Sequence, residues 1–191
     1  MKTRNMTFAL TGIAPLSQSR SIEEVELLSG ETFAAREHRV WKMKAHVDPE
    51  TKEVVIPAMA LKKSIAEAAK RLSLKKSGNA KWTNDILSSV IVTGDVSTGV
   101  HIDSTREEVV YCHVDGNPKS GKRVNRSFPV VPSGWKGQAS VVVIDPTIPE
   151  HIIEQCIHAA GNIIGVGRFR PEKGGYLGRF KVEKIKWGSE A

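Results

Sequence analysis

The sequence has 191 residues, of which 40% are hydrophobic and 26% are charged, which suits one well-packed domain and is short for two. Its formal net charge of +7, from 28 Lys and Arg against 21 Asp and Glu, favours polyanionic partners through phosphate contacts and counterion release. No apolar run approaches the ~20 residues that a membrane-spanning helix needs. We therefore expect a single cytoplasmic domain over residues 1–191, with no membrane partner.

Two cysteines, Cys112 and Cys156, stand far apart, without a second Cys or His at the spacing of metal ligands. The sequence therefore predicts no metal, no disulfide and no cofactor. We expect both cysteines to be small buried apolar residues.

The first third of the chain predicts a strand and a hairpin. Thr7 to Ala14 alternates and ends at Pro15, which indicates an opening strand. Ser17 to Ser29 is polar and predicts a loop with a short helical turn at Ile22 to Leu28. Arg36 to Val47 and Glu53 to Ile56 flank the turn residues 48–52, so we expect a β-hairpin insert over about 36–56.

The middle third predicts a helix and a long hairpin. Met59 to Leu72 carries one apolar stripe at helical spacing, opposite a basic face. Ser88 to Thr93 indicates a strand. Val109 to Val114 and Arg123 to Val131 predict the two arms of a second hairpin insert over about 109–131, with a basic turn at 116–122.

The last third predicts strand, helix and strand. Gln138 to Ile144 is a strongly apolar strand, and a helix is expected from about Pro149 to Ala160. Leu177 to Trp187 alternates with one slip, as a bulge would produce. Without the two hairpins the order is β-α-β-β-α-β, so the predicted class is α+β with a ferredoxin-like or RRM-like core.

Residues 161–179 form the most informative segment. Six glycines lie between a helix and a strand and alternate with basic residues such as Arg168, Arg170 and Lys173. Glycine lets a ligand approach backbone N–H groups, and basic side chains neutralise phosphates, so we expect a backbone-binding loop. The alternative is that these glycines only permit a tight connection and the arginines are solvated. Because the glycines precede a strand and not a helix, the loop does not match the glycine-rich phosphate-binding motifs of ATP- or NAD-binding proteins.

This glycine-rich loop resembles the loop between the final helix and final strand of the RAMP superfamily of CRISPR-associated proteins. A second segment, residues 48–63, is similar to the turn, strand and "IPGSSLKG" helix start of subunits that coat guide RNA: Ile56, Pro57, Leu61 and Lys62 match, whereas Ala58, Ala60 and Lys63 differ. The resemblance implies a palm of RRM-like fold, basic grooves for an RNA backbone, and a hairpin thumb for which residues 109–131 are the candidate.

The predicted function is non-catalytic binding of single-stranded nucleic acid, expected to be CRISPR guide RNA, by copies assembled side by side with other effector-complex subunits. Phe169 and Tyr176 are candidates for stacking on bases. The predicted binding residues are Arg39, Lys42, Lys44, Lys62, Lys63, Gly165, Gly167, Arg168, Phe169, Arg170, Lys173, Gly174, Gly175, Tyr176 and Arg179.

Three alternatives remain open at this point. Guide-processing members of the superfamily cut RNA without metal, so a metal-independent endoribonuclease would use His38 or His46 as general base. A phage-type protein that binds or anneals single-stranded DNA is the second. The third is a mimic that joins a CRISPR complex without binding nucleic acid. Type III backbone subunits of the superfamily cut target RNA with an Asp a few residues before the matching turn. Lys42 and Met43 stand in that stretch here, so the resemblance does not lead us to expect metal-dependent cleavage.

Overall fold

The computed structural model describes residues 3–23, 25–113 and 121–188. Its largest sheet has the strand order β4-β8-β1-β9, with β1 (Arg4–Gly12) in the interior and every neighbouring pair antiparallel. The other strands are β4 (Val90–Val92), β8 (Lys136–Val143) and β9 (Phe180–Trp187). All four were predicted, and together with the helices they agree with the α+β class.

Alternation in β1 gives this sheet a buried and an open face. Met6, Phe8 and Leu10 are each 1% exposed and face the core, whereas Thr7 and Ala9 lie on the other face. The pairing of β1 with β9 shifts register between Thr7 and Ala9, and Lys184 in β9 has a φ of 53°. The predicted bulge is therefore confirmed.

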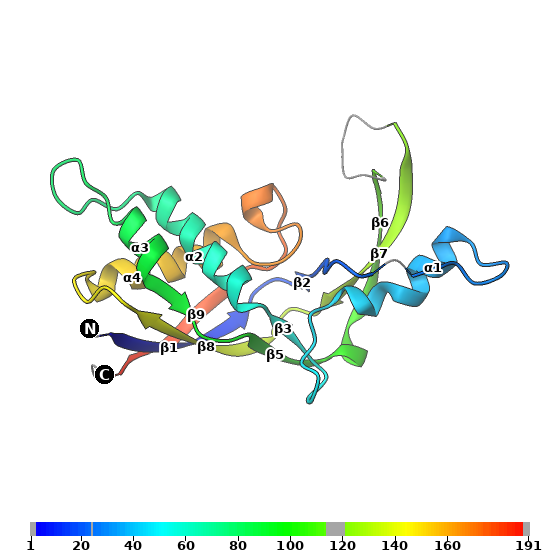
Figure 1. Ribbon diagram of the computed structural model, residues 1–191, viewed down its shortest axis with the longest axis horizontal. Coiled ribbons are helices and arrows are strands. Elements are labelled where there is room, and N and C mark those ends of the chain that lie inside the picture. The colour runs from blue at the N-terminus through cyan, green and yellow to red at the C-terminus, as the bar shows by residue number, and fades with distance from the viewer. Residues whose placement is uncertain (1–2, 24, 114–120, 189–191) are drawn as a thin grey trace.

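Helices cover the buried face of the sheet (Figure 1). The predicted helices are confirmed as α2 (Ala58–Leu72) and α4 (Glu150–Ala159), and a short helix, α3 (Thr83–Ser89), was not predicted. The expected apolar stripe of α2 is buried. After α4 the chain continues through one π-helical turn, Ala160–Ile164, which leads into the glycine-rich loop.

The predicted hairpin over residues 109–131 is confirmed for its described part. It consists of β6 (Arg106–His113) and β7 (Arg123–Val131), which pair antiparallel, with the two-residue strand β2 (Leu16–Ser17) beside β7. Residues 114–120, which hold most of the predicted turn, lie outside the described residues. Figure 1 shows the hairpin projecting from the body of the molecule.

The predicted hairpin over residues 36–56 is wrong in its first arm. Residues 33–40 form α1 (Phe33–Val40), which continues into a 3₁₀ turn, Trp41–Lys44. Thr32 caps this helix by accepting a hydrogen bond from the Ala35 N–H, and Glu37 and Val40 share its buried face. The second arm exists as β3 (Glu53–Ile56), but it pairs with β5 (Val96–His101). The helical turn expected at 22–28 is not formed in the described part of that segment.

A large buried aromatic residue, Trp135, connects the end of β1 to the segment that follows it. Trp135 is 2% exposed, packs 6.3 Å from the Phe180 ring, and donates from Nε1 to the Ala14 carbonyl at 3.1 Å. A side chain at Gly12 would place its Cβ 2.1 Å from Trp135 Nε1, which explains the glycine at the end of β1. The chain after β1 is thereby fixed beneath the glycine-rich loop.

Candidate nucleic-acid interface

The glycine-rich loop folds back on itself and is fastened to the chain that follows β1. Val166 N–H donates to the Gly178 carbonyl at 3.0 Å, which closes the loop across its base. Arg168 N–H donates to Ser17 at 2.8 Å, and Gly178 N–H donates to Pro15 at 2.7 Å. These bonds fix the direction in which the loop presents its side chains.

Close backbone contacts account for several of the glycines. A Cβ at Gly175 would lie 1.8 Å from the Phe169 carbonyl oxygen, and one at Gly178 would lie 1.8 Å from that of Val166. At Gly167 the clash would be with the Ser17 oxygen, at 2.4 Å. The alternative explanation, a tight connection, therefore suffices for these three positions.

The structure also changes the expected role of the loop amides. Many of them donate to protein carbonyls and are not presented to a ligand: those of Gly165, Val166, Arg168, Lys173, Gly174, Gly175, Leu177 and Gly178. A ligand at this loop would therefore be bound mainly by side chains.

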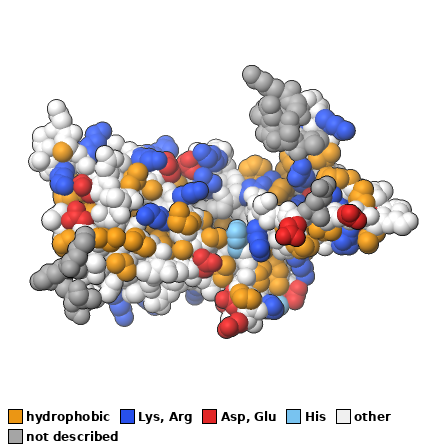
Figure 2. All heavy atoms as spheres, in the orientation of Figure 1, with side chains coloured by type: hydrophobic (Ala, Val, Ile, Leu, Met, Phe, Trp, Pro, Cys, Tyr) orange, Lys and Arg blue, Asp and Glu red, His pale blue; other side chains and the backbone are white. Residues whose placement is uncertain are grey.

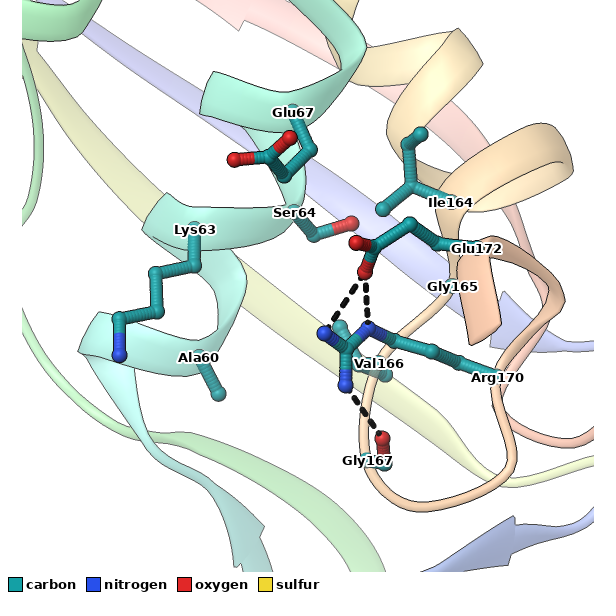
Figure 3. Close-up of a pocket in the computed structure, with 10 residues that line it drawn as sticks. All are labelled: Ala60, Lys63, Ser64, Glu67, Ile164, Gly165, Val166, Gly167, Arg170 and Glu172. Carbon is teal, nitrogen blue, oxygen red and sulfur yellow. Dashed lines mark hydrogen bonds and ion pairs between the residues drawn. The ribbon is translucent and has the colours of Figure 1, made fainter. Parts of the chain in front are cut away.

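Two adjoining cavities, of about 230 Å³ and 390 Å³, lie between the start of α2 and the loop. They share Ala60, Gly167 and Arg170, so together they form one groove, hereafter the α2–loop groove. Figure 3 shows the smaller cavity, with α2 on one side and the loop on the other. The two segments that carry the sequence resemblance thus meet in space.

The smaller cavity has mixed charge. Arg170 donates to Glu172 at 2.7 Å and to the Gly167 carbonyl at 3.1 Å (Figure 3). Lys173 also pairs with Glu172, at 2.9 Å, and these hydrogen bonds, first from Lys173 and then from Arg170, hold the pKa of the Glu172 carboxyl below its usual value. Lys63 and Glu67 line the same cavity from α2, so opposite charges balance there.

The larger cavity contains no carboxylate among the residues that line it. Its lining combines basic, aromatic and apolar groups: Leu16, Gln18, Ser19, His46, Ile56, Pro57, Ala60, Gly167, Arg168, Phe169 and Arg170. Burial, and secondly the charge of Arg20, lower the pKa of the His46 imidazole, which favours its neutral form. Of the two, this cavity is better suited to a nucleotide, because nothing acidic there repels a phosphate.

Gln18 is one of several residues of this cavity that the sequence did not predict as site residues. Gln18 is 5% exposed, and its amide donates to the Val55 carbonyl at 2.8 Å while accepting from the His46 N–H at 2.7 Å. It therefore fixes the backbone of His46 against β3. In the sequence Gln18 lies in a polar stretch without periodicity, so no signal distinguishes it.

The basic residues predicted near α1 do not reach the groove. Arg39 pairs with Glu31 at 2.8 Å, and Lys42 pairs with Asp103 at 2.6 Å. The prediction for Lys44 needs correction, because this side chain is only 6% exposed. It donates to Glu37 at 2.5 Å and to the Ser127 carbonyl at 2.9 Å, so it joins elements of the fold.

The groove therefore gathers part of the predicted set. Lys63, Gly165, Gly167, Arg168, Phe169 and Arg170 line it, whereas Lys62, Lys173, Gly174, Gly175, Tyr176 and Arg179 do not. Of the two predicted general bases, His46 lines the groove, and the exposed His38 contacts Glu107 at 2.5 Å on the hairpin.

Lys and Arg side chains gather along the helical side of the molecule, interspersed with Asp and Glu (Figure 2). Among the described residues, no three His, Cys, Asp or Glu side chains are grouped so that they could hold a metal ion. No helix in the described ranges is long and apolar enough to cross a membrane.

The fold is similar to that of one chain in a solved RNA-bound assembly. A chain in the cryo-EM structure of the Type III-B Cmr-beta bound to cognate target RNA aligns with a TM-score of 0.62 and 13% identity. The alignment covers 97% of this protein and 61% of that chain. At this identity the alignment shows a shared fold. No protein-family model matches the sequence, and no curated protein matches it.

Proposed function

We propose that the protein is a non-catalytic subunit of a CRISPR effector-type complex and binds single-stranded RNA along the α2–loop groove. The observation that carries the proposal is the position of this groove. It lies where the glycine-rich loop meets the start of α2, inside a fold that aligns over 97% of its length with a chain of an RNA-bound Cmr-beta.

We further propose that β1, α2, β4, β8, α4 and β9 form the ferredoxin-like core of a RAMP relative. The strand order β4-β8-β1-β9, with both long helices against one face, supports this assignment. RRM proteins stack bases on aromatic residues of their open sheet face. Here that face carries Thr7, Ala9 and Ser140, so the groove is the better candidate for RNA.

The test is a fluorescence-anisotropy titration of labelled single-stranded RNA and of the matched DNA at several salt concentrations. The variant Lys63→Ala/Arg170→Ala removes two cations that line the groove. If each contacts a phosphate, the slope of log K against log salt decreases in magnitude by about 1.4.

The matched control is Arg71→Ala/Lys75→Ala, which removes the same charge near the other end of α2, outside the groove. It should affect binding less than the groove variant does. Equal losses would show that only net charge matters, and absence of binding by the unmodified protein would refute the proposal. Tighter binding of DNA than RNA would favour the single-stranded DNA alternative.

Side-by-side assembly on longer RNA is part of the same proposal. Native mass spectrometry with strands of increasing length should then show stepwise addition of copies. A single copy on every strand would contradict this part.

A second candidate function is metal-independent RNA cleavage, and the observation that favours it is His46. This imidazole lines the larger cavity with Arg168 and Arg170, and its lowered pKa favours the neutral form that a general base needs. Loss of cleavage in His46→Ala but not in His38→Ala, with chelator present, would establish it. Intact RNA after incubation with the unmodified protein would exclude it for the RNAs tested.

A further inference from the structure

Phe169 is held in an unfavourable backbone conformation at the rim of the larger cavity. Its φ is +51°, in the left-handed region, which is unfavourable by about 1–2 kcal/mol for a residue with a bulky side chain. Its carbonyl accepts from the Leu177 N–H at 3.0 Å, and only a glycine at position 175 allows the chain to pass so close. The folded loop therefore imposes this conformation, and 45% of the Phe169 residue surface remains exposed.

Arg168 supports the same ring from within the protein. Its guanidinium carbon lies 4.1 Å from the Phe169 ring centroid and 3.4 Å from that of Phe128, which is 8% exposed in β7. A guanidinium packed on aromatic rings at these distances gains cation–π and stacking energy. Arg168 thus connects the loop to the base of the β6–β7 hairpin.

Arg168 is poorly placed to bind a phosphate. Its side chain is 12% exposed, and its Nη1, which lies 3.8 Å from a Glu108 carboxylate oxygen, has no hydrogen-bond partner among the described residues. Burial, partly opposed by Glu108, lowers the pKa of the guanidinium. This side chain therefore acts within the protein, as a support for Phe169.

The cavity in front of Phe169 has the composition of a nucleobase site. It is about 390 Å³ in volume, and Pro57, Ile56 and Leu16 contribute apolar surface, while His46 and Ser19 contribute polar groups. A ring face, apolar walls and a few polar groups without a carboxylate are what a stacked, unpaired base requires.

We propose that this cavity receives one unstacked RNA base, that Phe169 is the platform on which the base stacks, and that Arg168 is a positioning residue that holds the platform. The inference rests on the proposed function, because it presupposes that RNA enters the α2–loop groove. It assigns Arg168 a role different from the phosphate contact expected from the sequence.

The test compares a labelled oligouridylate of about ten nucleotides, within the usual site sizes, with an abasic strand of the same length and charge. One stacked base predicts that the unmodified protein binds the base-bearing strand about 5- to 150-fold more tightly. Phe169→Leu, which keeps an apolar side chain without a ring face, should abolish most of this preference, and Phe169→Trp should retain it. The control Phe33→Ala removes an exposed aromatic residue of α1 and should leave the preference unchanged.

Arg168→Met separates positioning from phosphate binding. A positioning role predicts that the preference for the base-bearing strand decreases while the salt slope stays the same. A phosphate contact predicts a slope smaller by about 0.7 and an unchanged preference, which would overturn the role assigned to Arg168.

The two proposals fail in different ways. Salt-dependent but equal binding of the two strands would overturn the base pocket and leave the proposed function standing. No binding of either strand would overturn both. Circular dichroism of each variant verifies that losses do not come from unfolding.

Discussion

The buried ion pair between Glu37 and Lys44 yields a stability prediction of definite size. The two residues are 4% and 6% exposed, and Ser127 contacts both, since its N–H donates to Glu37 at 3.1 Å and its carbonyl accepts from Lys44 at 2.9 Å. Lys44→Met keeps the apolar stem but removes the closest counter-ion of the buried Glu37 carboxylate, which then retains only the Arg36 guanidinium at 3.7 Å. Such a loss costs about 3–5 kcal/mol in the free energy of unfolding.

The double variant Glu37→Leu/Lys44→Met removes both charges. The Ser127 backbone groups and the partly exposed Arg36 guanidinium then lose a partner, but no buried charge remains, so we expect a smaller loss of about 1–3 kcal/mol. The neighbouring Lys42→Met serves as control, because the Lys42–Asp103 pair is solvent-exposed and should contribute at most about 1 kcal/mol.

Urea denaturation followed by circular dichroism measures these differences. With a slope of about 2 kcal/mol/M, Lys44→Met should lower the midpoint by roughly 1.5–2.5 M. A decrease no greater than that of Lys42→Met, or a double variant less stable than Lys44→Met, would refute the reasoning. Either result would mean that Lys44 is not the buried partner described above.

Three further predictions concern the loop, the thiols and acid stability. Gly175→Ala should destabilise the protein by about 1–3 kcal/mol and weaken RNA binding, because its Cβ would lie 1.8 Å from the Phe169 oxygen; thermal denaturation and the anisotropy assay measure the two effects. Cys156 should resist a thiol reagent such as DTNB until the protein is unfolded in urea, because it is buried and burial raises the pKa of its thiol to about 11. The hydrogen bond from Arg39 lowers the pKa of Glu31 to about 2, so stability from this pair should be complete above about pH 4.5 and disappear as pH falls towards 2.

Each has a control. Gly121→Ala, where a Cβ meets nothing within 4 Å, should change stability little. Cys112, which is only partly buried, should react before Cys156 in the folded protein. Glu31→Gln should be less stable than the unmodified protein at neutral pH, and this difference should shrink as the pH falls from about 4.5 towards 2. A stability difference that stays constant over this pH range would contradict the assignment of this pKa.

The sequence sufficed to predict the elements whose apolar period is regular. The stripe of α2 and the alternation of β1, β8 and β9 each point to one buried face, and the structure confirms them. The sequence did not predict the elements whose secondary structure depends on tertiary contacts. Residues 36–44 mix basic and apolar side chains without a clear period, and their helical form depends on the buried Glu37 contacting Lys44 and β7. β5 was missed because Gly99, with a φ of 66°, and polar residues interrupt it.

The candidate site was predictable in position but not in detail. Glycine and arginine content identified the loop, yet no local pattern shows that Arg168 is buried on Phe128, forty residues earlier in the chain and on the hairpin. Nor does it show that Arg170 is paired with Glu172 while Lys63 approaches from α2. These relations arise from the packing of distant segments.

The position of β1 in the sheet also constrains how the protein is made in a cell. This strand precedes both of its neighbours, β8 and β9, in the chain, so its last pairing partner follows roughly 170 residues later. At about 5–20 residues per second, β1 waits on the order of 10–30 s for that partner. During this time the edge of β1 that pairs with β9 has no hydrogen-bonding partner. Ribosome-associated chaperones therefore have a defined target in the nascent chain, and slow translation of the last strand would extend the period in which aggregation competes with folding.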